Sequence, residues 1–159
     1  MTSTNEDFVL PDGFKFSVRS VGRTVTEGEF AAMTNLTWTF EEIHTNKFHA
    51  QEVMGNERML AGGCLIAFAL GLATPAIKPG LTERGVRLIA LVGYNDVRFR
   101  SPLFPGDTIY VEATLLRIRR TRQAHRGVVT FHDNVIDHSG RLLAEYERRA
   151  LCDVSAAGL

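Results

Sequence analysis

The fold is governed by the segment L-A-G-G-C-L-I-A-F-A-L-G-L-A, from Leu60 to Ala73. These residues predict a helix that is apolar on every side, and such a helix must be buried. Its glycine-rich start would direct free backbone N–H groups at whatever lies beside it. The segment L-T-W-T-F-E-E-I-H-T-N, from Leu36 to Asn46, stands just upstream and brings a histidine near those groups. Together the two segments predict a site for a polarised carbonyl group.

Prolines and a capping motif predict where the helices begin and end. The long apolar helix is expected to end near Thr74, because Pro75 and Pro79 follow. Upstream, the sequence T-E-G-E from Thr26 to Glu29 fits a capping box that starts a short helix running to about Leu36. The polar segment from there to Glu57 predicts short helices and loops.

The remaining sequence predicts strands. An extended segment or strand is expected before the first helix, and β-branched and aromatic residues favour long strands after the last one. In the second of these, Ile109, Val111 and Ala113 alternate with polar residues, so one face of the strand is buried. A tight hairpin is expected at His138–Gly140. The expected strands span residues 12–25, 87–99, 107–122, 127–137 and 141–154.

This order of elements predicts an α+β protein of one domain. An antiparallel sheet wrapped around a single long buried helix satisfies both the apolar helix and the one-sided strands, which is the hot-dog fold. The free sheet edge of such a fold is expected to pair in a homodimer or a dimer of dimers.

The length and composition of the chain favour a single soluble domain. A chain of 159 residues with 45% hydrophobic residues suits one soluble globular domain. The 18 basic and 18 acidic residues balance, which predicts no general attraction to nucleic acid or to a membrane.

Cys64 and Cys152 lie in apolar surroundings, typical of reduced thiols, and we expect a cytoplasmic location. We expect no metal site and flexible tails at residues 1–11 and 155–159.

With these residues in view, the chain resembles the MaoC-like dehydratase family, hot-dog proteins that include (R)-specific enoyl-CoA hydratases. The segment from Leu36 to Gly63 carries the resemblance, together with V-R-F-R-S-P-L-F-P-G-D-T-I-Y-V-E from Val97 to Glu112. The resemblance covers most of residues 25–154. It implies an acyl-CoA thioester as the substrate, with coenzyme A as part of that substrate and no separate cofactor.

The family motif places an aspartate five residues before a histidine. Aligning the motif on Leu36 puts His44 at the histidine and Thr39 at the aspartate. A branch that resembles mesaconyl-CoA hydratases also lacks this aspartate. A second register puts His49 at the histidine, with His44 in place of the aspartate, and we prefer the first.

Hydration of an enoyl thioester needs an acid–base group and donors for the carbonyl oxygen. His44 suits the proton transfers, because imidazole titrates near neutral pH. We expect Glu41 to be its partner, or Thr39 to orient a water molecule. The Gly63 and Cys64 N–H groups are expected to bind the oxyanion, with Gly62 and Asn46 nearby.

Other readings of the site remain open. The basic run from Arg117 to Arg126 can bind the phosphates of coenzyme A through Arg117, Arg119 and Arg122, or it can be a solvated strand end. A thioesterase would use Glu41 or Glu42 to activate water. A protein that only binds acyl thioesters would keep the pocket and lose the acid–base pair.

Overall fold

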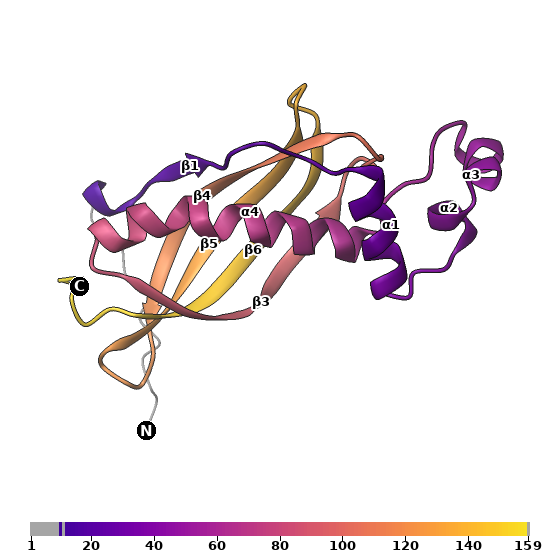
Figure 1. The fold of residues 1–159 in the computed structure, drawn as a ribbon. Helices are drawn as coiled ribbons and strands as arrows, with labels where there is room; N and C mark the ends of the chain where they lie inside the picture. The colour runs from indigo at the N-terminus through magenta and orange to yellow at the C-terminus, as the bar shows by residue number, and fades with distance from the viewer. Residues whose placement is uncertain (1–9, 11, 159) are drawn as a thin grey trace.

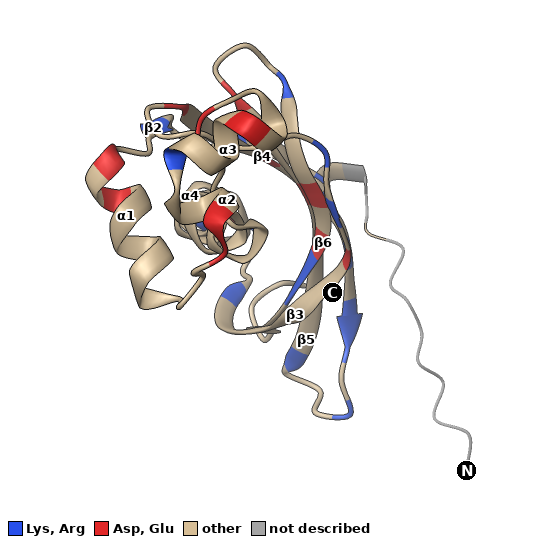
Figure 2. Ribbon diagram, turned by 90° about the vertical axis from the view of Figure 1, so that its right-hand side faces the viewer, with Lys and Arg blue, Asp and Glu red and all other residues tan. Residues whose placement is uncertain are grey.

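The computed structural model describes residue 10 and residues 12–158, and it contains one antiparallel sheet with a long helix, α4, lying along it (Figure 1). The strands follow the order β1-β4-β5-β6-β3, and β2 also pairs with β4. Figure 2 shows the helices gathered on one side of the curved sheet. This arrangement confirms the predicted fold class. The strands are β1 (Ser17–Arg19), β2 (Arg23–Thr24), β3 (Arg87–Phe99), β4 (Thr108–Arg120), β5 (Arg126–Asp137) and β6 (Leu142–Asp153).

Helix α4 runs from Gly62 to Glu83 and contains both Pro75 and Pro79, so the predicted end near Thr74 is wrong. Each proline removes one backbone hydrogen bond. The helix continues because the buried stripe continues: Ile77 and Leu81 are both buried in the core beyond the first proline. By length and composition alone α4 could cross a membrane. Here its buried stripe packs against the sheet, and its other side stays largely uncovered by this chain.

Short elements in the first half of the chain match the sequence pattern. Helix α1 (Glu27–Leu36) begins with the predicted capping box between Thr26 and Glu29. Two short helices follow, α2 (Glu42–Thr45) and α3 (Lys47–Met54). The extended segment before α1 is broken into a 3₁₀ turn at Asp12–Phe14 and the strands β1 and β2.

A tight turn joins β5 to β6. The hairpin at His138–Gly140 is confirmed, with Gly140 in the left-handed region at φ 85°. The Asp137 carboxylate fixes it by accepting from the backbone N–H groups of Ser139 and Arg141. Of the predicted flexible tails, residues 1–9, 11 and 159 lie outside the described residues, whereas the Ser155 N–H donates to the Asp153 carboxylate at 3.0 Å.

The core is divided by a buried ion pair. Phe131 belongs to one apolar cluster and Tyr146 to the other. Between them along β5 and β6, Arg148 Nε donates to Asp133 Oδ2 at 2.5 Å, and the two side chains are 2% and 0% exposed. The Tyr146 hydroxyl is also buried and has no hydrogen-bond partner among the described residues. The core face of the sheet therefore carries a buried ion pair, and we expect the stability of the fold to depend on both partners.

Candidate active site

The start of α4 presents the predicted free amides. Ala61 is the N-cap and supplies no side-chain cap, and no described residue accepts from the Gly62 or Gly63 N–H groups. The Cys64 N–H, in contrast, donates to the Ala61 carbonyl at 2.9 Å. The first-turn donors open to a ligand are therefore those of Gly62 and Gly63, one residue earlier than the pair expected from the sequence.

A cavity of about 390 Å³ lies beside these amides. Its walls include Gly62, Gly63, Leu65 and Phe99. A side chain at position 62 would meet the Phe99 ring, because an added Cβ would stand 2.5 Å from Phe99 Cζ. Position 63 has no atom within 4 Å of an added Cβ. Glycine at 62 thus allows the close approach of β3 that forms this wall.

His44 is held against the loop that leads into α4. Its Nδ1 lies 2.6 Å from the Met59 carbonyl oxygen, three residues before Gly62, and the side chain is half-buried. Because a carbonyl oxygen can only accept, Nδ1 carries the proton in this contact, which leaves Nε2 as the basic nitrogen of the ring. The ring is therefore oriented and has one nitrogen available for proton transfer.

Ion pairs fix the loop that carries Met59. Arg58 Nη2 lies 2.7 Å from Glu27 Oε1, and Arg58 Nε lies 3.1 Å from Glu57 Oε1. Lys47 Nζ lies 3.2 Å from the other oxygen of Glu57. The backbone N–H of Arg58, together with its guanidinium, lowers the pKa of Glu57 to about 2. These contacts connect α1 and α3 to the loop. The Met59 carbonyl oxygen, which accepts from His44 Nδ1, therefore has a defined position.

The two proposed partners of His44 differ in their placement. The Glu41 side chain is exposed, and no described residue forms a hydrogen bond or ion pair with its carboxylate. The Thr39 hydroxyl lies 2.8 Å from the Thr37 hydroxyl, which in turn lies 3.3 Å from Cys64 Sγ. Thr39 is thereby connected to the start of α4, whereas Glu41 is not.

Asn46 serves the fold. Its Oδ1 accepts from the N–H groups of Phe48 and His49 and so caps α3, and its Nδ2 donates to Glu42 at 3.1 Å. Both polar atoms of the side chain already have partners, so we assign Asn46 to helix capping rather than to the substrate. The alternative histidine, His49, has its Nδ1 3.8 Å from a Glu42 carboxylate oxygen.

Of the predicted site residues, only Gly62 and Gly63 line the cavity, whereas His44, Glu41, Thr39 and Asn46 do not. The Cys64 thiol is buried at 2% exposure. Arg117 and Arg119 lie near the far end of β4, and Arg122 lies in the exposed loop after it. The Met59 carbonyl and the Arg58 anchor were missed, because a backbone oxygen leaves no signal in a sequence. Among the residues described, no three His, Cys, Asp or Glu side chains gather to hold a metal ion.

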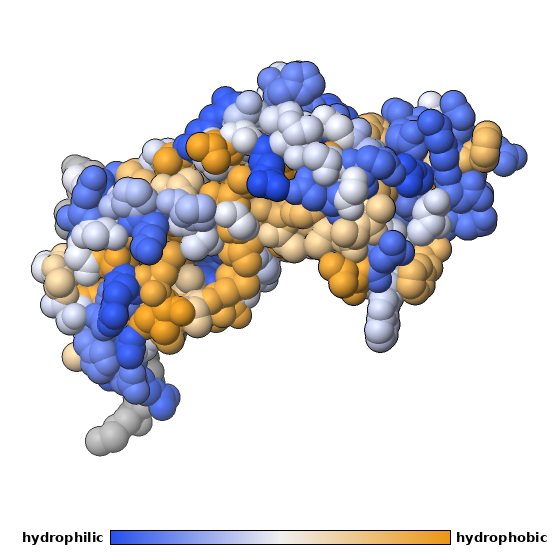
Figure 3. Space-filling view, viewed as in Figure 1, coloured by the Kyte–Doolittle hydropathy of each residue, from blue (hydrophilic) through white to orange (hydrophobic). Residues whose placement is uncertain are grey.

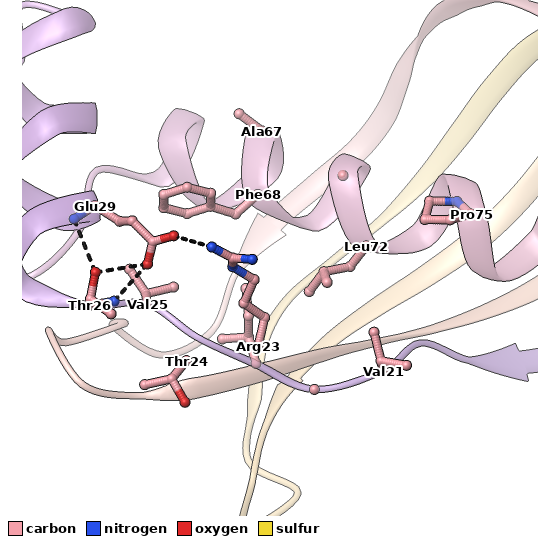
Figure 4. Close-up of a pocket in the computed structure, with 13 residues that line it drawn as sticks. Val21, Arg23, Thr24, Val25, Thr26, Glu29, Ala67, Phe68, Leu72 and Pro75 are labelled. Carbon is pink, nitrogen blue, oxygen red and sulfur yellow. Dashed lines mark hydrogen bonds and ion pairs between the residues drawn. The ribbon is translucent and has the colours of Figure 1, made fainter.

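A second and larger cavity, about 960 Å³, lies between residues 21–26 and the outer side of α4 (Figure 4). Phe68, Leu72 and Pro75 form an apolar wall. Its two charged side chains, Arg23 and Glu29, form an ion pair with each other. It contains no histidine and no free helix amide, so its size does not make it the better candidate for acid–base chemistry.

A curved antiparallel sheet with one long helix defines a hot-dog protein, and its candidate site is the cavity at the start of that helix, with a histidine bound to the loop that precedes it. Residues 15–135 match the family model described as MaoC like domain, and the chain belongs to this family. It is a family of hydratases and dehydratases.

Individual relatives agree with this assignment. The chain is 28% identical over 144 residues to the β-methylmalyl-CoA dehydratase of Chloroflexus aurantiacus, which covers 90% of this chain and 38% of that protein. The monoamine oxidase regulatory protein of Archaeoglobus fulgidus has a TM-score of 0.74 and 26% identity, over 87% of this chain and 88% of that one.

A Mycobacterium tuberculosis protein described as a double hotdog fold has a TM-score of 0.73 and 22% identity, over 92% of this chain and 43% of that one. The likeness confirms the hot-dog fold. The chain thus spans less than half the length of this protein and of the Chloroflexus relative.

Proposed function

We propose that this chain adds water to a 2-enoyl-CoA, or removes it from the corresponding 3-hydroxyacyl-CoA, in the cytoplasm. The observation that carries the proposal is the contact between His44 Nδ1 and the Met59 carbonyl, which holds the imidazole beside the loop leading to the Gly62 and Gly63 amides. The name of the Chloroflexus relative favours a branched or dicarboxylic acyl group.

The proposed chemistry uses residues of this chain and water. In the hydration direction, His44 Nε2 takes a proton from water while the water oxygen bonds to the β-carbon of the substrate. The double-bond electrons move toward the thioester, and the Gly62 and Gly63 N–H groups stabilise the negative charge on its oxygen. The α-carbon then takes the proton back from the imidazolium. We assign Thr39 the role of orienting the attacking water, and its hydrogen-bonded link through Thr37 to Cys64 supports this assignment.

The test is to incubate the protein with crotonyl-CoA and with mesaconyl-CoA while following enoyl absorbance and free thiol. Loss of absorbance without thiol release is the expected result. Thiol release would instead indicate a thioesterase. Binding of the thioesters without either change would indicate a binding protein, and both of these outcomes contradict the proposal.

The geometry favours hydration over hydrolysis. A thioesterase needs a carboxylate beside the thioester carbon, yet the Glu41 side chain is exposed and Glu42 interacts with Asn46 and His49. The imidazole, in contrast, is oriented by a 2.6 Å contact. Coenzyme A enters the proposal only as part of the substrate.

We also propose that two copies pair through β3 in a homodimer. Strand β3 is the long edge of the sheet, and its exposed apolar residues are Ile89, Leu91, Val92, Val97 and Phe99. Apolar surface extends across the face that carries α4 and β3 (Figure 3). A contiguous apolar face of this kind is typical of a surface covered by another protein. Because Phe99 also lines the cavity, the second copy would lie next to the candidate site.

Replacing Val92, which is 53% exposed, by aspartate is expected to yield monomers and to remove most hydratase activity. A charge placed at the paired edge would be buried without a partner. Sedimentation equilibrium measures the mass directly. Val21→Asp, on the opposite edge region and 79% exposed, is the control and should leave the mass unchanged. A monomeric wild-type protein, or a dimeric Val92→Asp variant, would contradict the pairing.

A further inference from the structure

Three arginines meet around a small cavity on the sheet. The cavity measures about 180 Å³ and is lined by Arg117 and Arg119 of β4, Val128 and Thr130 of β5, and Arg149 of β6. In the strand register, Arg117 stands opposite Thr130, which stands opposite Arg149. The three positions therefore form one row across three neighbouring strands, and Arg119 lies two residues further along β4.

This row faces away from α4. Arg148, the neighbour of Arg149, is buried in the core, and successive side chains of a strand point to opposite faces. Arg149 therefore projects from the outer face. Figure 2 marks the Lys and Arg positions along the strands of the sheet. Next along the row, Gly93 of β3 has no atom within 4 Å of an added Cβ and leaves space beside Arg149.

The charge in the cavity is not balanced by the residues that the structure describes. Arg117 is paired with Glu147 at 3.2 Å, whereas no described carboxylate pairs with Arg119 or Arg149. The Arg149 Nε is buried and finds no acceptor among the described residues. A buried donor on a cation, beside two further guanidinium groups, is left without the acceptor that it requires.

We infer that this cavity binds a phosphate group through Arg117, Arg119 and Arg149. Planar guanidinium groups match the oxygens of phosphate, and a phosphate dianion would balance the two unpaired charges and give Arg149 Nε its acceptor. The phosphate can come from inorganic phosphate or from the nucleotide of coenzyme A. The site lies on the opposite face of the sheet from the α4 amides, so phosphate binding there can be measured separately from hydration. Arg122 does not line it.

The test uses the full chain at constant ionic strength, with isothermal titration calorimetry of inorganic phosphate and of coenzyme A. We expect phosphate binding that weakens about tenfold or more in Arg149→Gln and in Arg119→Gln. Arg149→Lys keeps the charge and loses the planar fork, so it should also weaken binding. Arg19→Gln removes one charge from a pair with Glu112 on the same outer face and should leave the affinity unchanged.

The two ligands identify the source of the phosphate. If coenzyme A displaces phosphate and its affinity also falls in Arg149→Gln, the nucleotide of coenzyme A occupies the site. If coenzyme A does not compete, free phosphate is the ligand. Absence of phosphate binding, or an equal loss in Arg19→Gln and Arg149→Gln, would overturn the inference, and thermal melting confirms that each variant is folded.

Discussion

Replacing His44 by glutamine is expected to lower the kcat of enoyl-CoA hydration by about 10²- to 10⁴-fold, the usual contribution of a positioned acid–base group. Glutamine keeps a polar side chain of similar reach but cannot carry the proton between water and the α-carbon. The KM for the thioester should change little, because the Gly62 and Gly63 amides that would bind the carbonyl oxygen remain in place. Enoyl absorbance gives kcat and KM in the same assay.

His49→Gln is the matched control for this variant. His49 lies on α3 and approaches Glu42 at 3.8 Å, and we place it outside the proton transfers. Its substitution should leave kcat within about a factor of three of the wild-type value, well below the effect of removing a general base. Should His49→Gln lose activity while His44→Gln keeps it, the second alignment register would be correct and the roles would be exchanged.

Removing Asp133 is expected to produce the largest loss of stability. The Asp133→Ala variant leaves the Arg148 guanidinium, 2% exposed, without its carboxylate. Breaking a buried pair in this way costs about 3–5 kcal/mol, because the remaining charge stays out of water without compensation. Urea unfolding followed by circular dichroism measures the change in the free energy of unfolding.

A double variant separates the charge from the packing. Asp133→Leu combined with Arg148→Met removes both charges and keeps apolar volume, so it should recover most of the stability lost in Asp133→Ala. Glu112→Gln, on an exposed position of β4, should change the free energy of unfolding by less than about 0.5 kcal/mol. A cost below about 1 kcal/mol for Asp133→Ala would mean that Arg148 reaches water or another partner.

The elements set by local chemistry were predictable from the sequence. The capping box at Thr26 requires only residues three apart, and it forms as expected. The alternation of Ile109, Val111 and Ala113 reports which face of β4 meets the core, and all three are buried. In both cases the signal and the structure involve neighbouring residues.

Features that depend on distant residues were not predictable in the same way. The helix passes through Pro75 because Ile77 and Leu81 gain burial against strands that follow later in the chain. The pairing of Asp133 with Arg148 depends on the register of β5 and β6, in which Asp133 faces Tyr146 and Arg148 is a diagonal neighbour. The one sequence signal for a buried arginine is the adjacent pair Arg148 and Arg149. Successive side chains of a strand point to opposite faces, so one of the two must face the core.

The candidate site was predictable in part. The position of the glycine pair at the start of α4 follows from sequence, since helix starts expose N–H groups. The choice between Gly62 and Cys64 as donors depends on where the first turn closes, and the acceptor of His44 is a backbone oxygen of Met59. Both features depend on the positions of backbone atoms, which the order of side chains in the sequence does not determine.

The unequal edges of the sheet limit how far association can proceed. One edge is the thirteen-residue β3, and the other consists of β1 and β2, with three and two residues. The register of β3 against β6 is also interrupted three times, which bends the strand. Once two copies have joined through β3, the assembly offers only short outer strands for further addition, so growth into fibres is self-limiting.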